Sequence, residues 1–165
     1  MATKRLIVLL AEDNRHDVVA TRRAWKLHGI ENPLHVVRDG EECLDYLYRR
    51  GRYGEPGAAP RPGLLVLDIK MPKVDGLGVL RAIRSDERLR LLPVTMLTTS
   101  DQDEDRLQSY DLGANAFIRK PLGFEGFAAA IKAIAEFWQL VEPARDFDSW
   151  PPGTQADGSS ARPPS

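Results

Sequence analysis

The chain contains almost no cysteine, since Cys43 is the single one among 165 residues. One thiol can form no intrachain disulfide and no thiolate metal cage, so we expect Cys43 to be a small core residue. Long apolar runs are also missing, because residues 6–11 form one of the longest and a membrane span needs roughly 20. The first residues lack the layout of a signal peptide. We therefore expect a soluble, cytoplasmic protein with no membrane partner.

Neither sign of charge is in excess. Lys and Arg together number 23 and Asp and Glu 24, which gives a formal net charge of −1. No basic surplus is available to neutralise phosphates, so no nucleic-acid partner is expected. Apolar residues at 42% and charged residues at 28% suffice for a core and a polar surface. This balance predicts one folded domain and excludes a wholly disordered chain.

Five short apolar segments are typical of strands buried on both faces of a parallel sheet. They span residues 6–11, 34–37, 64–68, 94–98 and 116–118. Helical spacing and helix-ending glycines predict helices over residues 14–29, 41–50, 76–84, 101–112 and 124–141. Strands that alternate with helices predict an α/β fold, a doubly wound five-stranded parallel sheet with five helices.

Two segments fall outside this alternation. Residues 51–63 hold four glycines and three prolines, which predicts an irregular loop. Residues 142–165 hold five prolines and few aliphatic residues, a composition typical of disorder. We therefore expect a folded domain over residues 1–141 and a mostly disordered tail over residues 142–165.

Charged and polar residues follow four of the five predicted strands. The first strand is followed by Glu12 and Asp13, the third ends in Asp68, the fourth ends in Thr98, and the fifth is followed by Lys120. Ligands of open parallel sheets bind at the carboxyl ends of the strands, so these side chains should converge. Acids held together repel one another unless a cation joins them, and oxygen ligands favour Mg²⁺. Any single acid could be a helix cap, but the whole set predicts a site.

The order and spacing of these residues resemble the receiver domain of bacterial two-component response regulators. The resemblance covers about residues 4–141 and rests on Glu12-Asp13, Asp68 within residues 67–72, Asp75-Gly76, Thr98 and Lys120-Pro121. It implies a flavodoxin-like receiver fold, in which a sensor histidine kinase passes a phosphoryl group to an aspartate. The chain would then be a response regulator with no output domain of its own.

The resemblance also implies a phosphorylation site and a metal site. Asp68 matches the family's phosphoacceptor aspartate, so it would become a phosphoaspartate. The family's Mg²⁺ ligands map to Glu12, Asp13, Asp68 and the backbone carbonyl of Lys70. The expected cofactor is therefore Mg²⁺.

Three further positions match the residues with which the family senses phosphorylation. Thr98 matches the switch hydroxyl, and Lys120 matches the lysine that contacts the phosphoryl oxygens. Phe117 lies where the family has a rotating aromatic switch residue. These matches predict that Thr98 and Phe117 respond when Asp68 is phosphorylated.

A narrower resemblance concerns the single-domain regulators paired with phytochrome-type sensor kinases. It rests on the 51–63 insertion and on residues 97–100, 108–112 and 137–138. The implied partner is a phytochrome-type sensor histidine kinase.

Two other functions are compatible with the same fold. A pseudo-receiver would bind proteins without phosphorylation, but the complete set of acids, threonine and lysine argues against it. A metal-dependent phosphatase would need a second acid beside Asp68, and residues 69 and 70 are Ile and Lys. We therefore expect no enzyme acting on outside substrates.

The last predicted helix suggests a dimer. Phe124, Phe127, Ile131, Ile134 and Trp138 are expected not to point inward all at once, so part of this apolar surface should remain exposed. We predict a homodimer through the fourth helix, the fifth strand and the fifth helix.

Overall fold

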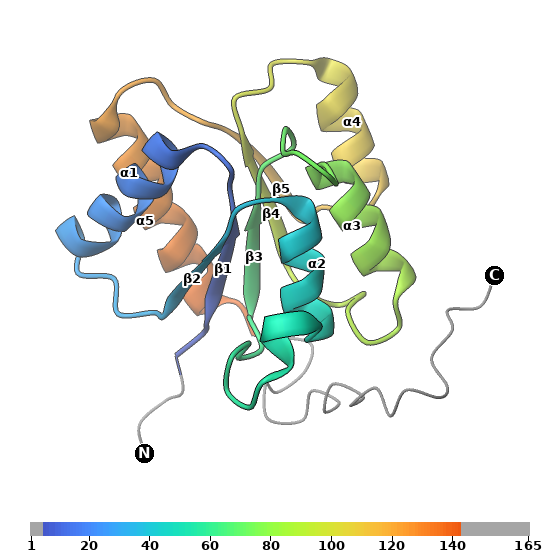
Figure 1. The fold of residues 1–165 in the computed structure, drawn as a ribbon. Coiled ribbons are helices and arrows are strands. Elements are labelled where there is room, and N and C mark those ends of the chain that lie inside the picture. The colour runs from blue at the N-terminus through green and yellow to red at the C-terminus, as the bar shows by residue number, and fades with distance from the viewer. Residues whose placement is uncertain (1–4, 143–165) are drawn as a thin grey trace, which may run out of the picture.

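The computed structural model describes residues 5–142, and five parallel strands run through its centre (Figure 1). The strands are β1 (Val8–Ala11), β2 (Leu34–Val37), β3 (Leu64–Leu67), β4 (Val94–Thr98) and β5 (Ala116–Arg119). Their order in the sheet is β2-β1-β3-β4-β5. This order confirms the predicted doubly wound sheet. The predicted tail lies outside the described residues, apart from Glu142.

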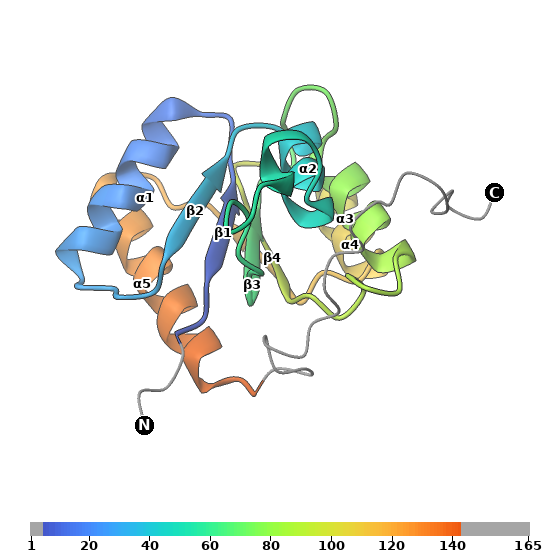
Figure 2. The same cartoon turned by 60° about the horizontal axis from the view of Figure 1, so that its bottom comes forward.

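Helices cover both faces of the sheet, as Figures 1 and 2 show. The pair α1 (Arg15–Leu27) and α5 (Phe124–Leu140) packs together on one face. The other face is covered by α2 (Gly40–Tyr48), α3 (Gly76–Ser85) and α4 (Asp103–Asp111). The five predicted helices are therefore all present, with ends that differ by a few residues.

The segment predicted as a wholly irregular loop, residues 51–63, begins with a short 3₁₀ helix, η1 (Gly51–Gly54). A ring contact and a hydrogen bond of Tyr53 hold this turn on the domain. The ring of Tyr53 lies 5.2 Å from that of Tyr46 in α2, and the Tyr53 hydroxyl donates to Glu42. Glycine and proline content alone did not reveal these contacts, because they depend on α2.

The strand side chains alternate between two apolar cores. Leu9, Ala11, Leu65 and Leu67 face the α2–α4 side, while Val8, Leu10, Leu64 and Val66 face α1 and α5. Cys43 is fully buried in the first core, as predicted. Because both faces of the central strands are covered, these strands form a stable base for the loops at their carboxyl ends.

The last helix lies where it was predicted, but the prediction that part of its apolar stripe stays exposed was wrong. Phe127, Ile131, Ile134 and Trp138 are all buried, and Phe124 packs against the same core. Their spacing of three and four residues forms one continuous stripe, which α1 and the sheet together are wide enough to cover. The indole N–H of Trp138 also donates to the Thr95 hydroxyl over 3.0 Å, which anchors the far end of α5.

No helix within residues 5–142 is both long and apolar enough to cross a membrane.

Candidate functional site

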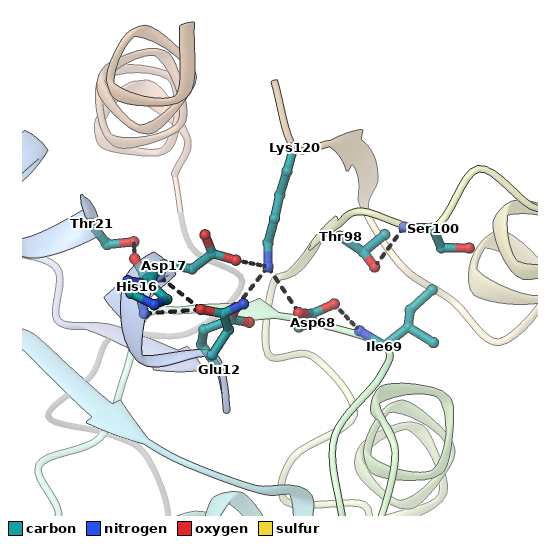
Figure 3. A network of polar contacts seen from close by, with 10 residues as sticks. Glu12, His16, Asp17, Thr21, Asp68, Ile69, Thr98, Ser100 and Lys120 are labelled. Carbon is teal, nitrogen blue, oxygen red and sulfur yellow. Dashed lines mark hydrogen bonds and ion pairs between the residues drawn. The ribbon is translucent and has the colours of Figure 1, made fainter. Parts of the chain in front are cut away.

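The predicted site residues meet at the carboxyl edge of the sheet, where backbone hydrogen bonds continue beyond the strands. The amide of Glu12 donates to the Val37 carbonyl over 3.0 Å, and that of Asp68 donates to the Ala11 carbonyl over 3.1 Å. The amide of Lys120 donates to the Thr98 carbonyl over 2.8 Å. These bonds align the strand ends, so their side chains share one rim (Figure 3).

Two local features hold the Asp68 carboxylate in place. One of its oxygens accepts a hydrogen bond from the Ile69 amide at 2.7 Å. Gly76, which starts α3, lies directly against Asp68: a Cβ added there would be 2.0 Å from the Asp68 carbonyl oxygen. A larger residue at position 76 would therefore push α3 away from the site.

The Lys120 ammonium lies among three carboxylates (Figure 3). Its Nζ is 2.7 Å from Glu12 Oε1, 2.8 Å from Asp17 Oδ2 and 2.9 Å from Asp68 Oδ2. The Lys120 side chain is only 6% exposed. An ammonium has three N–H donors, so the three carboxylates occupy all of them.

Burial and crowding of charge separate the pKa values of the two buried acids. Burial, together with the neighbouring Asp68, raises the pKa of Glu12 to about 9. Burial would also raise the pKa of Asp68, but hydrogen bonds from Glu12 and Lys120 and the charge of Lys120 hold it below its usual value. Burial lowers the pKa of Lys120, yet its contacts with Asp17, Glu12 and Asp68 raise it overall. The environment therefore favours the protonated form of Glu12, the ionised form of Asp68 and the charged form of Lys120.

Three of the acids could share a metal ion. Oxygens of Glu12, Asp13 and Asp68 all lie within 4.8 Å of one another. Burial and the neighbouring Asp68 disfavour the charged form of Glu12, which a bound cation would favour, and a set of oxygen donors suits a hard divalent cation. The donor set therefore fits a divalent metal. The role of the Lys70 carbonyl stays a prediction.

The predicted switch residues lie in two neighbouring strands: Thr98 ends β4, and Phe117 lies in β5. Thr98 is fully buried, and its hydroxyl oxygen accepts a hydrogen bond from the Ser100 amide at 3.2 Å. Phe117 is half-buried against the α2–α4 core, and its amide donates to the Tyr110 hydroxyl over 3.2 Å. The roles of Thr98 and Phe117 as switch residues remain predictions.

Sequence reasoning missed one residue of the site, Asp17. Its carboxylate contacts Lys120, although 103 residues separate the two along the chain. An acid in the first turn of a helix is ordinary, because it complements the helix dipole. The sole signal in the sequence is its position one helical turn after Asp13.

A hollow of about 350 Å³ lies away from this rim, beside the edge strand β2. Its lining consists of His35, Val36, Tyr46, Arg52, Tyr53 and Ala58. Three of its polar side chains are already paired: Arg52 and Tyr53 contact Glu42, and the Tyr46 hydroxyl donates to the Pro60 carbonyl. The acidic rim is therefore the better candidate for chemistry.

The fold and the rim together define a class of protein. Residues 8–132 match the model of the response regulator receiver domain family, so the chain belongs to this family. Such receivers act in two-component signal transduction, where they accept a phosphoryl group from a sensor histidine kinase.

Similar proteins narrow the class to small receivers. Rcp1 from Synechocystis sp., a response regulator, is 33% identical over 132 residues, which are 80% of this chain and 88% of Rcp1. The crystal structure of the phosphorylated cyanobacterial phytochrome response regulator RcpA has 34% identity and a TM-score of 0.79. The match covers 86% of this chain and 100% of the RcpA chain.

A crystal structure of the Mn²⁺-bound form of Rcp1 has 31% identity and a TM-score of 0.77, over 85% of this chain and 99% of that one. A probable methanogenesis regulatory protein, FilR2 of Methanothrix harundinacea, is 39% identical over 132 residues, or 80% of this chain and 83% of FilR2. This chain is therefore a homologue of the response regulator Rcp1 and of the phytochrome response regulator RcpA.

Proposed function

We propose that Asp68 is the residue that accepts the phosphoryl group from a sensor histidine kinase. One observation carries the assignment: the Asp68 carboxylate, directly after the central strand β3, lies 2.9 Å from the Lys120 ammonium. Burial raises the pKa of Glu12 to about 9, whereas contacts with Glu12 and Lys120 hold the pKa of Asp68 below its usual value. Asp68 is thus the buried carboxylate that can act as a nucleophile.

The transfer needs little beyond position and charge. An oxygen of Asp68 forms a bond to phosphorus while the bond between phosphorus and the donor histidine nitrogen breaks. The electron pair of that bond stays on the donor imidazole, which takes up a proton. Lys120 lies within reach of Asp68 and stabilises the charge on the phosphoryl oxygens.

The metal is proposed to be Mg²⁺, held by Glu12, Asp13, Asp68 and the Lys70 carbonyl. The all-oxygen donor set supports this choice, and so does the Mn²⁺-bound form of the relative Rcp1. Bound there, Mg²⁺ would supply positive charge against the phosphoryl oxygens.

Labelling with a small phosphodonor tests the proposed function. Acetyl phosphate with Mg²⁺ should add one phosphoryl group to the intact protein by mass spectrometry, and Asp68→Asn should abolish the addition. Asp103→Asn, an exposed acid at the start of α4, is the matched control and should label fully. Equal labelling of Asp68→Asn and the wild type would refute the assignment.

We propose a phytochrome-type sensor histidine kinase as the partner, acting in the cytoplasm where the kinase uses ATP. The similarity to RcpA and Rcp1 supports this choice. The chain is then a stoichiometric acceptor and no enzyme for outside substrates, and nucleic acid is not its partner. Phosphotransfer profiling against every histidine kinase of the source organism tests the pairing. Exclusive transfer from a kinase that senses no light would contradict it.

A homodimer through α4, β5 and α5 is also proposed. Exposed apolar side chains on these helices support it, namely Leu107 and Tyr110 on α4 with Phe137 and Leu140 on α5. Phe124 meets Arg23 of α1 on one flank of α5. At about 100° per residue, Phe137 falls on the opposite flank of α5, away from this contact with α1.

Sedimentation at micromolar concentration tests the dimer, with and without fluoroberyllate as a phosphoryl mimic. Phe137→Glu should give monomers because it places a charge in the contact. Val19→Glu, at an exposed apolar position of α1, should leave the dimer intact. A wild-type monomer in both states would end the proposal.

A further inference from the structure

The three carboxylates around Lys120 are not equivalent. Glu12 and Asp68 belong to the group of acids whose oxygens can share a cation, and the third member of that group is Asp13. Asp17 contacts Lys120 at 2.8 Å but does not belong to that group. Among the described residues, the Asp17 carboxylate therefore contacts Lys120 and does not belong to the group that could hold a metal.

The backbone of α1 holds Asp17 independently of the metal and the phosphoacceptor. Its amide donates to the side-chain oxygen of Asn14, the N-cap of α1, over 3.2 Å. Its carbonyl accepts the Thr21 hydroxyl at 2.7 Å. The side chain is about one-quarter exposed, whereas that of Lys120 is buried. A carboxylate fixed on a capped helix can hold a flexible lysine in one direction.

Phosphorylation changes the other two contacts. An oxygen of Asp68 would then be bonded to phosphorus, and Glu12, Asp13 and Asp68 are the residues that would hold the cation. Asp17 lies outside that group, so its contact with one N–H of Lys120 would be kept. The remaining N–H groups are then free for phosphoryl oxygens.

We propose that Asp17 is a positioning residue that fixes the Lys120 ammonium toward the phosphoryl group on Asp68. The proposal rests on the function proposed above. Asp17 touches neither phosphorus nor the nucleophile, and it acts only through Lys120. The competing explanation is that Asp17 merely stabilises the start of α1, as an acid in a first helical turn does.

A double-mutant cycle separates the two explanations. At saturating Mg²⁺, Asp17→Asn should slow labelling by acetyl phosphate about ten-fold, a factor that corresponds to about 1.4 kcal/mol. In the Lys120→Ala background, which should still label slowly, Asp17→Asn should change the rate less than about two-fold. Asp17→Glu should recover part of the rate, because it restores the charge.

Two controls distinguish the positioning of Lys120 from a general effect of removing an acid from the first turn of a helix. Asp103→Asn removes an acid from the first turn of α4 and should leave the rate unchanged. The ammonium N–H signal of Lys120, followed by NMR at one fixed pH without metal, should shift or broaden in Asp17→Asn and stay in place in Asp103→Asn.

The outcomes are distinct from those that test the proposed function. An equal loss of rate from Asp17→Asn in the wild type and in Lys120→Ala would overturn the positioning role. So would an unchanged rate together with an unmoved Lys120 signal. Absence of labelling in the wild type, or labelling of Asp68→Asn, would instead overturn the phosphoacceptor.

Discussion

At the scale of single residues, the site depends on charges gathered from distant parts of the chain. The strand-end residues Glu12, Asp13, Asp68 and Lys120 could be predicted, because parallel strands place their carboxyl ends at one edge. Asp17 could not, since its contact with Lys120 depends on where α1 lies relative to β5. The opposite pKa shifts of Glu12 and Asp68 could not be predicted either, because they follow from burial and from the contacts of each acid in the folded chain.

Cys43 provides a prediction at this scale. Its thiol is fully buried in the α2–α4 core, and burial raises its pKa well above the usual range. Ellman's reagent should therefore react with the native protein about a thousand-fold or more slowly than with the unfolded chain, because the thiolate is reached only through opening of the core.

An exposed thiol is the matched control for Cys43. Val19→Cys, made in a Cys43→Ala background, places a thiol on the outer face of α1 and should react at once. Fast labelling of Cys43 in the folded protein would contradict the packing of α2.

At the scale of elements, α5 shows what periodicity alone cannot decide. The sequence shows the stripe of large residues, but it does not show how wide a surface the rest of the protein offers to cover that stripe. That surface combines the sheet with α1, so the stripe is buried and the exposed apolar residues are Phe137 and Leu140.

Two truncations on α5 test this arrangement by chemical denaturation. Phe127→Ala should lower the free energy of unfolding by about 3–5 kcal/mol, because it leaves a cavity in the core. Phe137→Ala, on the exposed flank of the same helix, should cost less than about 1 kcal/mol in the monomer. Similar costs for the two variants would mean that α5 is rotated from the position seen here.

The start of α4 is the element that connects the site to the proposed dimer face. No side chain caps α4 at Gln102. Instead, the Ser100 hydroxyl donates to Asp105 over 2.6 Å, while the Ser100 amide donates to Thr98 over 3.2 Å. If Thr98 turns toward a phosphoryl group, its bond to Ser100 is released and the first turn of α4 with it.

Ser100→Ala tests the second bond of this connection, the one from the Ser100 hydroxyl to Asp105. Removing the hydroxyl leaves Asp105 without its partner, so amides in the first turn of α4 should exchange about five- to thirty-fold faster, which corresponds to about 1–2 kcal/mol. Ser85→Ala, which removes a hydroxyl bonded to Arg81 at the exposed end of α3, should leave α4 unchanged. Unaltered exchange in Ser100→Ala would exclude this connection.

At the scale of the whole molecule, the acidic rim should make stability depend on a divalent cation. Clustered carboxylates repel one another, and a cation held by Glu12, Asp13 and Asp68 should reduce this repulsion further than Lys120 does. At 100 times its dissociation constant, Mg²⁺ should stabilise the fold by about 2.7 kcal/mol and raise Tm by about 5–10 °C. Asp13→Asn should lose most of this rise, while Asp103→Asn should keep it. An equal rise in both variants would place the metal elsewhere.

The central claim is that Asp68 carries the phosphoryl group, and chemical trapping tests it most directly. Borohydride reduces an aspartyl phosphate to homoserine, so peptide mass spectrometry can identify the modified position. After labelling with acetyl phosphate and Mg²⁺, homoserine should appear at position 68 and at no other aspartate. Homoserine at Asp13 or Asp17, with position 68 unchanged, would contradict the account.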